Sequence, residues 1–180
     1  AAGRTASFDA AQYLANYADL AAAFGSDQTA AEAHYINNGF AEGRTSLRLA
    51  FNGTTGNDTF NGNAANNTFN GGLGNDTMTG GAGSDKFVFN TTPNAATNRD
   101  TITDFVSGTD LIQLSASVFT AFAAQVGSTV GLDAHLAYNS STGALAYDAD
   151  GAGPGAPVTF ALLGTSSHPA SLGQDFWIGA

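Results

Sequence analysis

The chain has 180 residues, of which 43% are hydrophobic, 11% are charged and 23 are glycine. Its formal net charge of -10 excludes the basic surface that nucleic-acid binding requires. The absence of cysteine excludes disulfides and thiolate metal sites. No apolar run approaches the ~20 residues of a transmembrane helix, while thirteen phenylalanines argue against a disordered chain.

Residues 1–49 form the first predicted unit, a small helical hairpin. Its apolar stripe recurs at helical spacing and consists of Tyr13, Tyr17, Leu20 and Phe24. Thr29 and Glu32 have the spacing of a capping box that begins a second helix, and Gly25 and Gly39 are suited to ending the two helices. We interpret this unit as a structural cap or spacer, with a carbohydrate-binding or partner-binding unit as the alternative.

A period of nine residues begins at Gly53 and runs to Val88. The four units, which abut without insertion, are GTTGNDTFN (53–61), GNAANNTFN (62–70), GGLGNDTMT (71–79) and GGAGSDKFV (80–88). The sixth residue of each unit is Asp or Asn, and the eighth is always large and apolar. A glycine-rich linker would not keep this register through four units, so the period predicts a repeat fold.

Each unit predicts a six-residue turn followed by a three-residue strand. The apolar eighth residue then points inward and stacks on its equivalents, which gives a parallel β-roll. Glycines let the turn carbonyls converge, and the Asp adds a charged oxygen. Calcium takes six to eight hard oxygen ligands, which one turn cannot supply but two stacked turns can.

Because two units make one coil, stacked turns are eighteen residues apart. We therefore expect Asp58 and Asp76 to face one Ca²⁺ together, and Asn67 and Asp85 to face another, with weaker binding where Asn replaces an acid. The Asp76 turn could share a third ion with residues after Phe89. The candidate ligands in the turns are Thr54, Gly56, Asp58, Asn63, Ala65, Asn67, Gly71, Gly72, Leu73, Gly74, Asp76, Gly80, Ala82 and Asp85.

The rest of the chain predicts further β-structure. Residues 99–114 alternate polar and apolar side chains around Gly108, which indicates two strands joined by a turn. Residues 116–124 predict a short helix. Residues 136–139 and 144–148 flank a turn as in a hairpin, and 158–163 predict one more strand. The end of the chain, Asp175-Phe-Trp-Ile178, fits either a buried last strand or an exposed recognition tail.

The repeats, followed by DTITDF (100–105), GTDLI (108–112) and YNSSTGALAYDADGAG (138–153), resemble the C-terminal region of serralysin-like proteases and related RTX (hemolysin-type) proteins. The resemblance covers residues 50–180, which we take as one domain. It implies calcium binding and an uncleaved C-terminal signal for type I secretion. Asp175–Ile178, an acid followed by apolar residues, resembles the endings found in that family.

Two further acidic stretches are weaker candidates. In the family, an Asp seven residues before the counterpart of Asp100 often helps to bind an additional ion, but Pro93 stands at that position here. Asp100 thus remains a candidate ligand, but without an Asp at position 93 to share the ion. Asp148 and Asp150 precede Gly151 as in an EF-hand loop, but the acid at the twelfth position is missing, so we expect a plain turn.

No motif predicts catalysis, since the chain lacks HExxH, G-x-S-x-G and P-loop patterns. We expect a secreted, calcium-binding module of a larger exported protein, with Ca²⁺ and the type I secretion apparatus as partners. Any catalytic domain would lie upstream, because the start of the chain suggests a fragment or processed product. The alternative is a structural or adhesive module of a bacterial cell-surface, S-layer-like or biofilm protein, which would bind glycans or self-associate.

Overall fold

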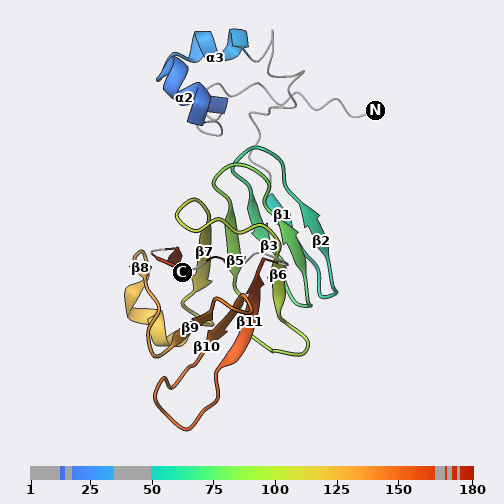
Figure 1. The fold of residues 1–180 in the computed structure, drawn as a ribbon, viewed down its shortest axis with the longest axis vertical. Helices are drawn as coiled ribbons and strands as arrows, with labels where there is room; N and C mark the ends of the chain where they lie inside the picture. Colours follow the sequence, from blue (N-terminus) through green and yellow to red (C-terminus); the bar gives the residue numbers. More distant parts are fainter. Residues whose placement is uncertain (1–12, 15–17, 35–49, 165–168, 170–171, 174) are drawn as a thin grey trace.

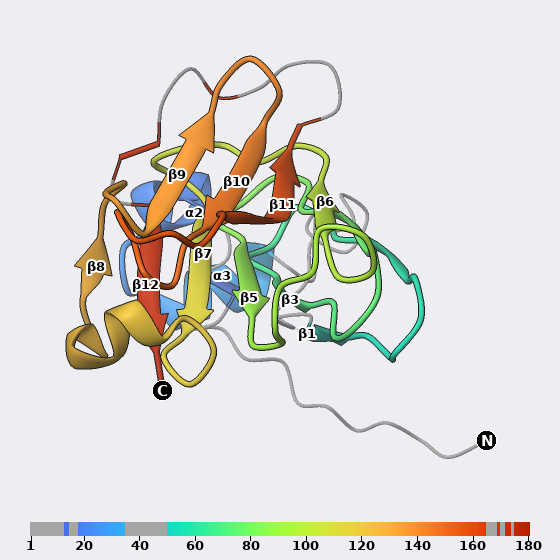
Figure 2. The same ribbon diagram turned by 90° about the horizontal axis from the view of Figure 1, so that it is seen from below.

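The fold is mainly β, with two sheets packed on one core. A computed structural model of the chain describes residues 13–14, 18–34, 50–164, 169, 172–173 and 175–180. The first sheet contains, in spatial order, β1 (Ala50–Asn52), β3 (Thr68–Asn70), β5 (Lys86–Phe89), β7 (Leu111–Ser115), β12 (Phe176–Gly179) and β8 (Thr129–Val130). The second contains β2 (Thr59–Asn61), β4 (Thr77–Thr79), β6 (Asp100–Ile102), β11 (Val158–Leu163), β10 (Ala144–Tyr147) and β9 (Leu136–Asn139). Figure 2 shows the sheets as two facing rows of strands.

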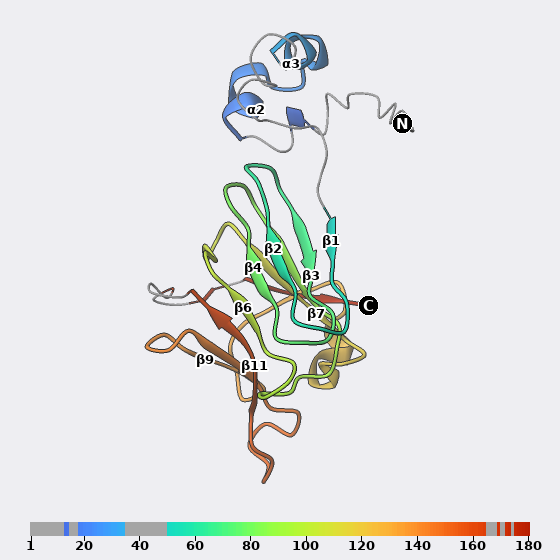
Figure 3. The same ribbon diagram turned by 90° about the vertical axis from the view of Figure 1, so that its right-hand side faces the viewer.

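The repeat region is the predicted parallel β-roll. Successive units place their strands alternately in the two sheets, so each coil takes eighteen residues, and Figure 3 shows the coils stacked one behind another. The register pairs Phe51 with Phe69 and Phe69 with Phe87, all in parallel. In the other sheet Phe60 pairs with Met78. The nine-residue period therefore sets both the strand spacing and the register.

After the repeats, the chain extends both sheets. β7 and β12 continue the first sheet in parallel, and β8 closes it in the antiparallel direction. β11 continues the second sheet next to β6, followed by the antiparallel hairpin of β9 and β10. The two strands predicted on either side of Gly108, the hairpin and the strand at 158–163 are confirmed (Figure 1). The first two, β6 and β7, lie in different sheets.

The short helix predicted at 116–124 is present, but it begins later than predicted. The structure has a 3-10 helix, η2 (Thr120–Gln125), and residues before it form a turn. The amides of Val118 and Phe119 both donate to the Ser115 carbonyl, which ends β7 in a tight turn. Phe119 is fully buried, and it contacts Tyr147 and Phe160 edge-on. Anchoring Phe119 in the core delays the helical turn until Thr120.

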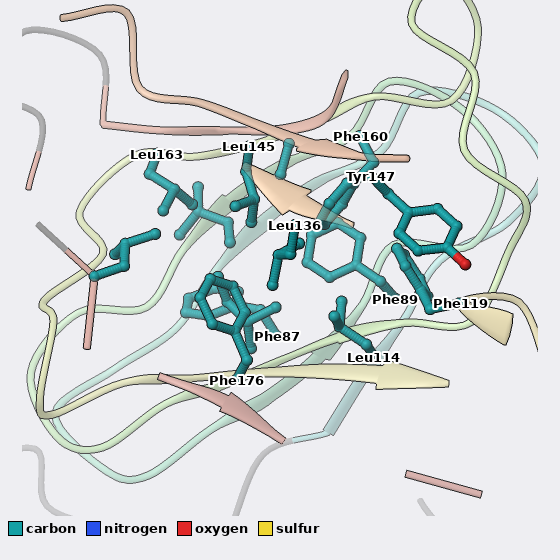
Figure 4. Packing of buried hydrophobic residues seen from close by; sticks show 14 of the residues in the cluster. Phe87, Phe89, Leu114, Phe119, Leu136, Leu145, Tyr147, Phe160, Leu163 and Phe176 are labelled. Atoms are coloured by element: carbon teal, nitrogen blue, oxygen red, sulfur yellow. The ribbon is translucent and has the colours of Figure 1, made fainter. Parts of the chain in front are cut away.

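The core is continuous from the repeats to the last strand. Inside the roll, the rings of Phe51, Phe69 and Phe87 stack with centroids 4.8 and 5.1 Å apart. Figure 4 shows how Phe87, Phe89 and Phe176 meet residues of β9, β10 and β11 in the same cluster. The C-terminal strands thus share one hydrophobic core with the last coils of the roll, instead of forming a separate one.

The described part of the N-terminal unit includes the short helices α2 (Ala18–Phe24) and α3 (Gln28–His34). Gly25 ends α2 with a positive φ of 58°, as predicted. The cap of α3 differs from the prediction, because Asp27, two residues before the expected Thr29, accepts the amide of Ala30. Tyr17 and Gly39 lie outside the described residues. The division at residue 49 into two domains stays a prediction.

Among the described residues, a hydrophobic cluster joins the helical unit to the roll. Ala65, in the turn of the second repeat, is fully buried in a cluster with Tyr13, Leu14, Leu20 and Ala31. The helical unit therefore packs on one turn of the repeat region.

Candidate metal centre

Acidic residues form two columns along the roll, each immediately before or at the start of a strand. One column contains Asp58, Asp76 and Asp100, at β2, β4 and β6. The Asp58 amide donates to Asp76 Oδ1 at 2.8 Å, and the Asp76 amide donates to Asp100 Oδ1 at 3.0 Å. Asp76 and Asp100 therefore each bind the preceding turn with Oδ1, which leaves Oδ2 for another contact.

The second column is built in the same way at β3, β5 and β7. The Asn67 amide donates to Asp85 Oδ1 at 2.7 Å, and the Asp85 amide donates to Asp110 Oδ1 at 3.0 Å. Asp76, Asp85, Asp100 and Asp110 are all buried, with at most 7% of each exposed. Four carboxylates buried in two columns require compensation, and for Asp76 and Asp85 the hydrogen bonds reach only one of the two oxygens.

The second oxygens of two of these residues have no partner. Among the described residues, Asp76 Oδ2 and Asp85 Oδ2 are buried carboxylate oxygens without a hydrogen bond. Buried polar atoms in native proteins are almost always satisfied, so an orphaned charged oxygen indicates a ligand position. This observation supports a cation at both columns.

Glycines keep space open around these oxygens. A Cβ at Gly71 would collide with Asp76 Oδ2 and would lie 3.1 Å from Asp100 Oδ2. A Cβ at Gly80 would likewise collide with Asp85 Oδ2. At Gly53, a Cβ would collide with the Gly71 carbonyl oxygen and lie 3.0 Å from Asp58 Oδ2. Oxygens from two successive turns thus face the same glycine-lined spaces, as a calcium cage requires.

Backbone carbonyls supply the remaining oxygens. No three carboxylate or imidazole groups in the described part of the chain meet as one metal-binding cluster. A cage here would therefore combine a pair of carboxylates with carbonyl oxygens, a donor set that suits Ca²⁺ and not Zn²⁺. The carbonyls of Thr54 and Gly56 face Gly72 and Gly74, and those of Asn63 and Ala65 face Gly81 and Gly83.

Electrostatics point in the same direction. Burial raises the pKa of Asp100 to about 7, against the lowering effect of the Asp76 amide, and the Asp76 carboxylate raises it further. Burial also raises the pKa of Asp85 to about 7, with the Asn67 amide opposing and the Asp110 and Asp104 carboxylates adding to the rise. The pKa of Asp76 is raised by burial as well. These carboxylates are costly to ionise without a cation.

The structure refines the predicted pairs. Asp58 and Asp76 are stacked as expected, but Asp58 Oδ2 accepts the amide of Thr54 at 2.7 Å and its hydroxyl at 2.9 Å. Asn67 Oδ1 similarly accepts the amide of Asn63. The structure adds two stacked pairs in which both carboxylates are buried, Asp76 with Asp100 and Asp85 with Asp110. In the second of these pairs, Asp110 Oδ2 also accepts the amide of Val106. Asp100 is thus well placed to bind a cation together with Asp76, although Pro93 supplies no side-chain oxygen.

Other predicted ligands differ in their environment. The Gly72 carbonyl accepts the Thr91 hydroxyl at 2.8 Å, and the Leu73 amide donates to the Thr54 carbonyl at 3.2 Å. The side chains of Leu73 and Ala82 are exposed, so any contribution from these residues would come from their carbonyls.

Two residues near the second column were not among the predicted ligands. Asp110 completes that column, although it lies 25 residues after Asp85 and outside the repeats. Asp104 accepts the amides of Gly80 and Gly81, each at 2.8 Å, and so anchors the fourth turn. The signal that could have found Asp110 is its place directly before an apolar strand, the same position that Asp76 and Asp85 occupy.

Asp148 and Asp150 lie in a hydrogen-bonded turn, and whether they bind an ion stays a prediction. The Asp150 amide donates to Asp148 Oδ1, and the Gly155 amide donates to Asp150 Oδ2 at 3.0 Å. The hydrogen bonds to the Gly155 amide and within this turn lower the pKa of Asp150, as is typical of a solvated carboxylate that caps a loop.

Comparison with known families agrees with this geometry. Residues 52–87 match four copies of the RTX calcium-binding nonapeptide repeat. The chain contains an RTX repeat region. The RTX match spans the first two coils of the roll, and it includes Asp58, Asp76 and Asp85 but neither Asp100 nor Asp110. A comparison with curated proteins found no match. In the described residues, no helix has the length and apolarity needed to cross a membrane.

Proposed function

We propose that this chain is a calcium-driven folding module of an exported protein. The observation that carries the proposal is the pair of buried, unpartnered oxygens on Asp76 and Asp85. Calcium at the Asp76–Asp100 and Asp85–Asp110 pairs would satisfy these oxygens and neutralise the charge in both columns. Carbonyls of the adjoining turns would complete the ligand shell.

Calcium would then act as part of the folding free energy. Without it, carboxylates in each column repel one another, and the net charge of -10 opposes compaction. The roll strands are only three or four residues long, so they bury little apolar surface to offset this repulsion. Extracellular calcium modules work at about 10⁻⁴–10⁻³ M. A chain of this kind would stay unfolded at low calcium and fold outside the cell.

The end of the chain fits such a sequence of events. Phe176 and Ile178 are fully buried in β12, so the acid-plus-apolar ending is inaccessible in the folded state. If this ending is a type I secretion signal, the exporter would have to recognise it before the module folds. Folding after export would then seal it into the core.

We further propose that the module has no catalytic activity of its own. Its buried carboxylates lie in the stacked turns, where calcium binding accounts for them. The histidines of the described turns and helices have structural partners: His135 Nδ1 is hydrogen-bonded to the Asp148 carbonyl, and His34 contacts Tyr13 and Phe24.

The test is circular dichroism of the chain during a calcium titration, with isothermal titration calorimetry for stoichiometry. We expect little β-structure in EGTA and a cooperative gain of β-structure as calcium is added. An unchanged, fully formed β signal in EGTA would refute the folding switch.

A matched pair of glycine variants tests whether the cages are responsible. Gly80→Ala places a methyl group against Asp85 Oδ2, whereas Gly131→Ala meets nothing within 4 Å. Neither glycine has a positive φ, so the variants differ in cage crowding and not in backbone strain. We expect Gly80→Ala to need at least about tenfold more calcium for folding, and Gly131→Ala to behave like the wild type.

A further inference from the structure

The last carboxylate of the chain, Asp175, lies next to the end of the second column. It is 3% exposed, immediately before β12. Asp175 Oδ1 accepts the amide of Gly108 at 2.7 Å, and Oδ2 accepts the Ser107 hydroxyl at 2.7 Å. These two bonds span 67 and 68 residues of sequence and connect the C-terminal segment to one turn, residues 106–110.

That turn holds Asp110. The Asp110 amide donates to the Val106 carbonyl at 2.9 Å, and the Val106 amide donates back to Asp110 Oδ2 at 2.8 Å. Gly108, at the tip of the turn, has a φ of 80°, a conformation that its missing Cβ permits. The orientation of the Asp110 carboxylate therefore depends on the turn, and the turn is fastened at its tip by Asp175.

The strand register shows that Asp175 does not extend the column itself. Lys86 pairs with Leu111, so Asp85 and Asp110 lie level with each other. Phe176 pairs with Ile112, so Asp175 lies level with Leu111, one residue out of step. Its carboxylate accordingly meets the turn at Ser107 and Gly108, and the Asp110 amide bonds to Val106. Asp175 therefore contacts the turn that holds Asp110 and is not itself a member of the column.

We propose that Asp175 is a positioning residue for calcium, which fixes Asp110 through the turn at 106–110 and so couples docking of β12 to ion binding at the Asp85–Asp110 pair. This inference rests on the proposed function. It makes the C-terminal segment a structural part of the last cage, and it predicts that the end of the chain becomes ordered when that cage fills.

The chain contains one tryptophan, Trp177, and it lies in β12 with 36% exposed. Its fluorescence therefore reports docking of the C-terminal strand during a calcium titration. In the wild type, we expect the fluorescence change to follow ion binding. Asp175→Asn should shift its calcium midpoint upward about tenfold, because it removes the charge from the acceptor of three hydrogen bonds, those from Ser107, Gly108 and Gly173.

Ser107→Ala separates positioning from charge. It removes one bond to Asp175 and keeps every carboxylate, and we expect an upward shift of about three- to fivefold. Asp133→Asn is the matched charge control, since Asp133 lies in an exposed turn and accepts the amides of His135 and Leu136. We expect no shift for this variant.

Calcium release from the folded protein distinguishes positioning from general destabilisation. After mixing with a chelator, Asp175→Asn and Ser107→Ala should accelerate the same release phase as Asp110→Asn, and leave unchanged the phase that Asp100→Asn accelerates. Equal acceleration of all release phases would overturn the inference. A calcium midpoint of Ser107→Ala equal to that of the wild type would overturn it as well. A wild-type chain without any calcium response would refute the proposed function as well, whereas a normal wild type with unaffected variants would refute the positioning role alone.

Discussion

Asp58 and Asp76 occupy equivalent positions in their repeats but have different hydrogen-bond partners. Asp58 Oδ2 is used by its own turn through Thr54, whereas Asp76 Oδ2 is buried and unpartnered. The first turn also lacks a preceding turn in the described structure, because no earlier strand pairs with β2. Asp58 and Asp76 thus have the same position in the motif, but only Asp76 has a buried carboxylate oxygen that is free to bind a cation.

The first prediction follows from this difference. Asp76→Asn should weaken calcium binding by about tenfold or more, since it removes a buried charged ligand. Asp58→Asn should weaken binding by no more than about threefold, because its carboxylate is partly committed to Thr54. Isothermal titration calorimetry of both variants measures the comparison. Equal losses of affinity would mean that Asp58 and Asp76 contribute as the equal pair that their spacing suggested.

Among the elements, the strands of the repeats and the β9–β10 hairpin were predictable from sequence, and the long-range pairings of the later strands were not. A nine-residue period fixes which residues face inward and which turns stack, so the roll follows directly from the pattern. β1 was missed, although Phe51-Asn52 repeats the ending of the first two units, because its turn residues do not match the motif. β12 could not be placed, since its pairing with β7 joins residues more than 60 positions apart and leaves no local pattern.

The same limit applies to the candidate site. Asp76 and Asp85 were found because they belong to the repeats. Their partners, Asp100 and Asp110, follow them by 24 and 25 residues instead of eighteen, so the period no longer indicates which turns stack. The extra residues form the loop before β6 and the turn at 106–110, whose positions depend on tertiary contacts.

The aromatic stack inside the roll gives an element-scale prediction. Phe87 is fully buried between Phe69 and Phe105, whereas Phe60 is only half-buried at the open end of the roll. Phe87→Ala should lower the free energy of unfolding by about 3–5 kcal/mol, and Phe60→Ala by clearly less. Urea unfolding at saturating calcium measures both. Equal losses would show that the end of the roll is as well packed as its centre.

At the scale of the whole molecule, protons and calcium should have opposite effects on stability. The pKa values of Asp85 and Asp100 rise from 3.8 to about 7 in the fold, because their burial penalises the charged form. The folded chain without calcium therefore binds more protons than the unfolded chain between about pH 4 and 7. Its stability is accordingly highest at the acid end of this window and is lost as the pH rises through 7.

Calcium reverses this slope, because it binds the deprotonated carboxylates. We expect the calcium-free chain to have more β-structure at pH 5 than at pH 8, and the apparent calcium affinity to increase over the same range. Circular dichroism of dialysed, calcium-free protein measures the first effect, and calorimetry at each pH measures the second. The double variant Asp85→Asn, Asp100→Asn should flatten both pH dependences, since it removes the two groups that titrate near 7. A calcium-free chain that is least structured at pH 5 would contradict the assignment of these buried carboxylates as the groups that oppose folding.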